Sequence, residues 1–188
     1  MPDELTPLDG LFTYHIFGEP RELPAWRRDP AGYRLRVSGL VTDELVLSLD
    51  DLRGLPMVEA DVVLQCMTNI HWGKIRVRGP SLDAVIRRAG AAQTARKLAI
   101  RGADGFTSDL GVEEVRAEPS RFLLALEMNG ESVPDEHGFP VRVVSEGKYG
   151  YKWCKWVTGI ELTDRDFRGH YELKRGWSDA GKRGTRVT

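Results

Sequence analysis

The sequence has 188 residues, of which 41% are hydrophobic, and its 27 lysines and arginines nearly balance 28 aspartates and glutamates, giving a net charge of −1. This length fits a single domain over residues 1–188 with enough apolar material for a core. The balanced charge gives no reason to expect a nucleic acid or an acidic membrane surface as a partner.

No stretch approaches the roughly 20 apolar residues of a membrane span, and residues 1–10 lack a hydrophobic signal core and a twin arginine. We therefore expect a cytoplasmic protein with no membrane span. A mature exported protein would look the same apart from Met1. The two cysteines, Cys66 and Cys154, are too few for a disulfide scaffold or a self-contained zinc site. A disulfide between them is an open alternative that a cytosolic location disfavours.

The first third of the chain is predicted to start irregular and then to form strands. Five prolines within residues 1–30 indicate a segment on the surface or along a site. Alternating apolar and polar residues then indicate strands and one short turn or helix. The strands are 33–37, 44–49 and 57–66, and the turn or helix is 50–53. The third strand ends in an apolar run, so Cys66 stands where a core strand meets a loop.

The clearest helix is predicted at residues 81–90. Ser81 can cap its start, Gly90 can close its end, and apolar residues form one stripe between them. Further strands are expected at 97–101, 122–128, 141–145 and 155–163, with a helical turn at 112–115 and a hairpin turn at Asn129-Gly130. Many short strands without regular strand–helix alternation predict an α+β, β-rich domain with a mixed sheet, and disfavour a doubly wound parallel sheet.

Cys66 is the first candidate for chemistry. A lone cysteine is most often a buried, inert thiol, and that alternative stays open on local sequence alone. The loop that follows is polar, however, and carries Asn69, His71 and Trp72. A strand-end cysteine that faces such a loop is well placed to bind a metal as the thiolate.

A second candidate site lies within residues 137–156. His137 and Arg142 bracket a glycine–proline turn, and the planar donors of an arginine suit a phosphate. Residues 148–156 then hold three lysines and four aromatic residues beside two glycines that allow close backbone approach to a ligand. A phosphate site is favoured over a solvated basic strand, and the negative net charge disfavours single-stranded nucleic acid stacked on the aromatics.

The ordered set of motifs resembles the molybdopterin-binding domain of the sulfite oxidase family over roughly residues 11–177. Its parts are Leu-Gln-Cys66 followed by Asn69, Gly-Ala-Asp104-Gly, Glu-Met-Asn-Gly130, His137-Gly-Phe-Pro-Val-Arg142, and Lys-Tyr-Gly-Tyr-Lys152 leading to Lys155-Trp156. The resemblance implies a molybdenum-cofactor (molybdenum–molybdopterin) oxidoreductase that transfers an oxygen atom to or from a small substrate, sulfite-like or sulfoxide-like.

By this resemblance, Cys66 is the catalytic residue and the single protein ligand to molybdenum, whose other ligands are two pterin dithiolene sulfurs and oxo or hydroxo groups. A soft thiolate suits such a site. Asp104 is expected to accept hydrogen bonds from the pterin. The other cofactor-binding residues implied are Tyr14, His15, His137, Arg142, Trp153, Cys154 and Lys155. Cys154 is expected to contribute its backbone rather than its thiol.

The chain departs from the sulfite-oxidising members where they bind the oxyanion. Ile70 and His71 stand where those members have arginines, Thr13 replaces another arginine, and Trp177 replaces the active-site tyrosine. Charge-assisted hydrogen bonds are worth roughly 1.5–3 kcal/mol each, so sulfite is a doubtful substrate. His71, with Lys74, is a partial substitute. The candidate substrate-pocket residues are Asn69, His71 and Trp177.

The chain shows neither the dimerisation domain nor the haem domain of larger members. We therefore expect a monomer that exchanges electrons with a separate carrier such as a cytochrome. Residues 174–188 hold five basic residues and one acidic residue, which favours a solvated tail over a patch that docks a partner. The functional alternatives are a molybdopterin-binding protein with little catalysis, and a relative that has lost the cofactor; the retained Cys66, His137 and Arg142 argue against the second.

Overall fold

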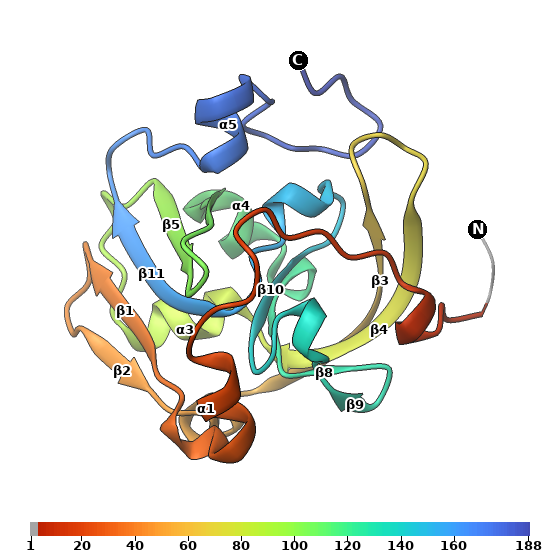
Figure 1. Ribbon diagram of the computed structural model, residues 1–188. Coiled ribbons are helices and arrows are strands. Elements are labelled where there is room, and N and C mark those ends of the chain that lie inside the picture. The colour runs from red at the N-terminus through yellow and green to blue at the C-terminus, as the bar shows by residue number, and fades with distance from the viewer. Residues whose placement is uncertain (1–3) are drawn as a thin grey trace.

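The computed structural model describes residues 4–188, in which short strands outnumber short helices (Figure 1). The strands are Leu35–Gly39 (β1), Leu45–Leu47 (β2), Met57–Gln65 (β3), Trp72–Pro80 (β4), Lys97–Gly102 (β5), Thr107–Gly111 (β6), Phe122–Ala125 (β7), Glu127–Met128 (β8), Glu131–Ser132 (β9), Arg142–Ser145 (β10) and Val157–Thr163 (β11). The α-helices are Leu23–Arg28 (α1), Leu49–Arg53 (α2), Leu82–Arg88 (α3), Val112–Ala117 (α4) and His170–Arg175 (α5). None of the described helices is long and apolar enough to cross a membrane.

The strands form three sheets. The five-stranded sheet has the order β2-β1-β11-β5-β6, in which β1 and β11 are parallel and the other pairs antiparallel. The four-stranded sheet, β3-β4-β8-β9, is dominated by the long β3–β4 hairpin, which lies on the opposite side of the molecule in Figure 1. The β7–β10 pair lies between them. The predicted α+β, β-rich, mixed-sheet fold is therefore confirmed.

The β7–β10 pair supplies both hydrophobic cores because successive side chains of a strand point to opposite faces. Leu124 and Val143 pack into the core that includes α3, whereas Leu123 and Val144 pack into the core under the β3–β4 hairpin. Strand β7 can approach β4 closely only because position 79 is a glycine. A Cβ on Gly79 would lie 1.9 Å from the carbonyl oxygen of Leu124.

Most predicted elements are confirmed with small shifts of boundary. The Ser81 hydroxyl accepts a hydrogen bond from the Ala84 amide and so caps α3. Asn129 and Gly130 have positive φ angles and form the turn between β8 and β9. The predicted strand at 122–128 is divided into β7 and β8, which join different sheets.

Three predictions need correction. The irregular segment predicted at residues 1–30 contains helix α1, and its residues 1–3 lie outside the described residues. Strand β4 was not predicted, although buried Ile75 and Val77 alternate with basic residues on it. The tail at residues 174–188 is mostly exposed, as predicted, but part of it is anchored to the domain: the Tyr149 amide donates to the Gly181 carbonyl (2.8 Å), and the Arg183 amide donates to the Gly147 carbonyl (2.8 Å).

Candidate functional site

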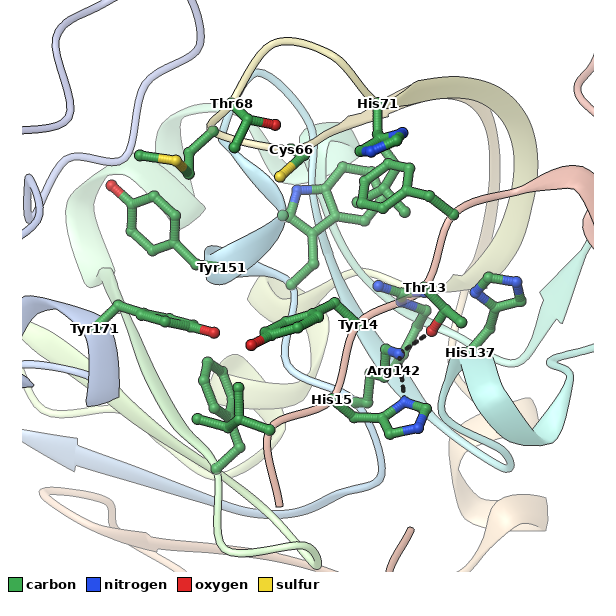
Figure 2. Close-up of a pocket in the computed structure, with 18 of the residues that line it drawn as sticks. Thr13, Tyr14, His15, Cys66, Thr68, His71, His137, Arg142, Tyr151 and Tyr171 are labelled. Carbon is green, nitrogen blue, oxygen red and sulfur yellow. Dashed lines mark hydrogen bonds between the residues drawn. The ribbon is translucent and has the colours of Figure 1, made fainter. Parts of the chain in front are cut away.

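A cavity of about 750 Å³ opens between the two large sheets, within the range typical of small-molecule and cofactor sites (Figure 2). Its wall is built from five parts of the chain that lie far apart in sequence. They are the N-terminal segment 12–16, the β3–β4 turn, the β5–β6 turn, the region from His137 to Lys155, and helix α5 with Trp177. The sheet topology brings these segments together.

Cys66 follows the last residue of β3, and its thiol points into the cavity (Figure 2). Its backbone is held by two hydrogen bonds: the Cys66 amide donates to the His71 carbonyl (2.8 Å), and the Asn69 amide donates to the Cys66 carbonyl (3.0 Å). Asn69 has a φ of 60°, which closes the tight turn. The turn thus presents a free, partly buried thiol without using the sulfur for packing.

Three basic residues, His137, Arg142 and Lys155, lie across the cavity from the β3–β4 turn; they are here called the cationic wall after the charges of Arg142 and Lys155. Arg142 is only 2% exposed, and its Nε and Nη1 atoms have no hydrogen-bond partner. His137 is 1% exposed; its Nε2 lies 3.3 Å from the Leu8 carbonyl oxygen, and its Nδ1 is unpartnered. Buried polar groups are nearly always satisfied in folded proteins, so these unpartnered atoms indicate a missing polar ligand.

The electrostatics of the cationic wall indicate that this ligand is an anion. Burial lowers the pKa of Arg142 to about 10. Burial, and then repulsion from Arg142, lowers the pKa of His137 to about 4 and that of Lys155 to about 7. The Lys155 ammonium donates to the Glu136 carbonyl (2.6 Å) and to the Thr13 hydroxyl, and lies 3.5 Å from His15 Nδ1. These hydrogen-bond partners of Lys155 are neutral groups, so they do not offset the positive charge of its ammonium group.

The stability of the cofactor-free chain is expected to rise with pH between about 7 and 9, because above this range the buried Cys154 thiol and the buried tyrosines, whose pKa values are raised, begin to oppose the rise. In this window the unfolded chain holds a proton on Lys155 that the folded chain has released, so unfolding takes up a proton and becomes harder as pH rises. Thermal melts across this range measure the slope. Lys155→Met should remove most of it, and millimolar inorganic phosphate should flatten it. A slope unchanged in the variant would contradict the prediction.

The opposite part of the cavity is aromatic. Tyr171 and Trp177 stack with ring centroids 4.2 Å apart and planes 8° from parallel. Tyr151 meets Trp177 edge-on at 5.0 Å. Figure 2 shows the hydroxyl of Tyr14 pointing towards that of Tyr171. Burial raises the pKa of Tyr171 to about 12, so its phenol stays protonated at neutral pH and can donate a hydrogen bond.

The structure brings ten of the twelve predicted site residues to this cavity. They are Tyr14, His15, Cys66, His71, Asp104, His137, Arg142, Trp153, Lys155 and Trp177. The Asp104 carboxylate accepts a hydrogen bond from the Phe106 amide (3.0 Å), and burial raises its pKa. The ring of His71 lies beside that of Phe12, with centroids 5.9 Å apart.

Two predicted residues do not line the cavity. Cys154 is fully buried in the core, where burial raises the pKa of its thiol. It is a free cysteine, as is Cys66, so the disulfide alternative is wrong. The Asn69 side chain instead accepts hydrogen bonds from Gln65 Nε2 (2.8 Å) and from the Tyr149 hydroxyl (3.3 Å).

The cavity also contains residues that the sequence did not single out for a role. They include Met67, Thr68, Phe106, Tyr151, Tyr171 and Arg175. Tyr151 belongs to the aromatic, lysine-rich segment 148–156, which could have flagged it. Tyr171 and Arg175 lie on α5, a helix without a local motif, and no sequence signal indicated them.

The chain is similar to several known proteins. The family model described as oxidoreductase molybdopterin binding domain matches residues 22–171. The oxidoreductase YuiH of Bacillus subtilis is 32% identical over 146 residues, covering 77% of this chain and 72% of that protein. Mitochondrial sulfite oxidase of Homo sapiens is 31% identical over 200 residues, covering 92% of this chain and 37% of that protein.

A solved structure has the same fold. The sulfane dehydrogenase SoxCD from Paracoccus pantotrophus matches with a TM-score of 0.78 and 23% sequence identity, over 92% of this chain and 46% of that chain. The chain thus spans less than half the length of this protein and of human sulfite oxidase.

Proposed function

The chain belongs to the family of oxidoreductase molybdopterin-binding domains, and from this premise we propose that it transfers an oxygen atom to or from a small neutral substrate and exchanges electrons with a separate carrier. The observation that carries the proposal is the buried Arg142 guanidinium, whose Nε and Nη1 donors are unpartnered beside the cavity. A phosphate group accepts hydrogen bonds from guanidinium donors of this kind, and the cofactor of this family carries a phosphate group.

The residues of the cavity fit the cofactor by their chemistry. Arg142, His137 and Lys155 would hold its phosphate, and Asp104 with His15 would bind the pterin. Cys66 would provide the thiolate ligand to the metal. Tyr14 and Trp153 line the cavity between these groups and would contact the ring. When bound, the cofactor supplies two-electron redox chemistry and takes up or gives up an oxygen atom.

A neutral substrate such as a sulfoxide is favoured over sulfite. The turn that carries Cys66 presents Met67, Thr68 and His71 to the cavity without an arginine, and Arg175, which lines the cavity from α5, is an exposed residue. The protonated Tyr171 hydroxyl can donate a hydrogen bond to a sulfoxide oxygen, a role for which the Trp177 indole is less suited. Reduction of a sulfoxide consumes two electrons and two protons and yields a thioether and water, so a carrier must deliver the electrons.

The test is metal content and turnover of the full chain, expressed in a host that makes the cofactor. We expect nearly one molybdenum per chain by mass spectrometry, and kcat/KM at least about tenfold higher for a sulfoxide, with a reduced dye as donor, than for sulfite with an artificial acceptor. Molybdenum without either turnover would favour a cofactor-binding protein with little catalysis. A folded chain without molybdenum would contradict the proposal.

A further inference from the structure

Three aromatic residues form one wall of the cavity, here called the aromatic wall: Tyr151, Tyr171 and Trp177. They come from the short 3-10 helix Gly150–Lys152, from α5, and from the segment after α5. In Figure 2 Tyr151 and Tyr171 lie on the same side of the cavity, below the turn of Cys66 and Thr68 and away from Arg142 and His137. The aromatic wall therefore borders the part of the cavity next to the Cys66 thiol.

A charge network, here called the buried charge network, lies behind this wall; Asp109, Lys152 and Glu172 are buried in it, and Asp179 is half-exposed at its edge. Its members are Lys97, Asp109, Lys152, Glu172 and Asp179. The three carboxylates lie within 4.8 Å of one another, and two ammonium groups lie among them. The network thus ties the sheet strands β5 and β6 to the 3-10 helix Gly150–Lys152, to α5 and to the segment after α5.

Lys152 and Lys97 connect the network. The fully buried Lys152 ammonium donates to Asp109 Oδ1 (2.9 Å), contacts Glu172 Oε1, and lies 3.7 Å from Asp179 Oδ1. The Lys97 ammonium donates to Asp109 Oδ2 and to Asp179 Oδ2, both at 2.6 Å. Burial of an ion pair is weak evidence for stability, because desolvation opposes the attraction, but several oppositely charged groups around one ammonium group constrain where each of them can lie.

Each ring of the aromatic wall is close in sequence to a member of the network. Tyr151 precedes Lys152, Tyr171 precedes Glu172, and Trp177 is two residues before Asp179. The Tyr151 hydroxyl also donates to the Ser178 carbonyl oxygen (2.7 Å). Fixing the charged side chains therefore fixes the backbone from which all three rings project.

We propose that the buried charge network positions the aromatic wall, and that this wall binds an aromatic or other flat apolar substituent of the substrate beside Cys66. This inference rests on the proposed function. Ring–ring contacts favour offset or edge-on geometries, so a small displacement of the backbone loses them. The residues of the network act through the rings and do not touch the substrate.

The test compares two inert analogues, methyl phenyl sulfone and dimethyl sulfone, which measure binding without turnover. Calorimetry on the cofactor-loaded chain is expected to show binding of the phenyl compound about tenfold tighter or more, since burying a ring in an aromatic site adds apolar area and ring contacts. In Asp179→Asn this preference should fall to about threefold or less. That variant removes the third carboxylate, so two ammonium groups and two carboxylates remain.

The matched control is Asp166→Asn, the same change at an exposed carboxylate that pairs only with Arg168 (3.1 Å) among the described residues. It should keep the wild-type preference. Lys152→Met is the second variant; if it folds, it should lose the preference entirely, because Asp109 and Glu172 are left facing each other. Molybdenum content should be equal in the wild type, Asp179→Asn and Asp166→Asn, which separates positioning of the wall from cofactor binding.

Two results would overturn the inference: equal affinity of the wild type for both sulfones, or an undiminished preference in a folded Asp179→Asn chain. Steady-state kinetics provide a second readout. With methyl phenyl sulfoxide, Asp179→Asn should raise KM about threefold to tenfold, with kcat for dimethyl sulfoxide unchanged. Failure of the proposed function would appear differently, as absent turnover in a wild type that contains molybdenum, and the preference between the sulfones is still measurable in that protein.

Discussion

Replacing Cys66 by alanine is expected to abolish the molybdenum(V) paramagnetic signal and the turnover, while the melting temperature changes by only about 2 °C or less. The thiol would be the protein ligand to the metal, so its loss removes the attachment between the chain and the redox centre. The fold should tolerate the change because the turn is held by backbone hydrogen bonds from the Cys66 and Asn69 amides. Electron paramagnetic resonance and calorimetry measure the two effects.

The other cysteine offers a matched control with the opposite outcome. Cys154 is fully buried in the core, and its thiol does not line the cavity. Cys154→Ala should keep the molybdenum signal and cost about 1 kcal/mol of stability, because a small cavity replaces the sulfur. An unchanged signal in Cys66→Ala would remove Cys66 from the metal site and return it to the inert thiol that local sequence alone allowed.

Replacing Arg142 by methionine is expected to abolish retention of the pterin and, at the same time, to stabilise the cofactor-free chain. The guanidinium is buried with unpartnered donors, and burial lowers its pKa to about 10. Apolar replacement of buried charges can stabilise by about 1–4 kcal/mol. In a chain of this size each kcal/mol corresponds to about 2–4 °C in Tm.

A loss of pterin together with a gain in stability is expected only if Arg142 binds a ligand, because an arginine with a purely structural role would lower the stability when replaced. Pterin content of the purified chain is measured by fluorescence after release, and stability by thermal melting without cofactor. Arg101→Met serves as the control, since that side chain is exposed and pairs with Glu161 (3.1 Å); it should change neither quantity. Full pterin retention in Arg142→Met would exclude Arg142 from the phosphate site.

The cavity combines two environments that suit different parts of the expected ligands. The cationic wall of His137, Arg142 and Lys155 demands an anion, whereas the aromatic wall offers ring faces and edges near Cys66. A cofactor with a phosphate at one end and a metal at the other would extend from the first towards the second. The substrate would then meet the metal beside the aromatic wall.

Local sequence was sufficient for features that depend on neighbouring residues. The apolar end of β3 indicated that Cys66 stands at a strand end, and the capping serine with its apolar stripe indicated α3, because periodicity and caps are local properties. The ordered motifs around Cys66, Asp104, His137 and Arg142 indicated the family. The alternation of apolar and basic residues on β4 is also a local signal for a strand, although this strand is not among those predicted from the sequence.

Only the tertiary structure decided which side chains share the cavity. Cys154 lies between two lining residues yet points into the core, because adjacent side chains in extended chain point to opposite sides. Asn69 turns away because its positive φ angle closes the turn. Tyr151 and Tyr171 line the same cavity as Cys66, because the sheet topology brings together segments that are far apart in the sequence. No local pattern records such contacts, since they depend on how distant strands pair and on which charges are buried together.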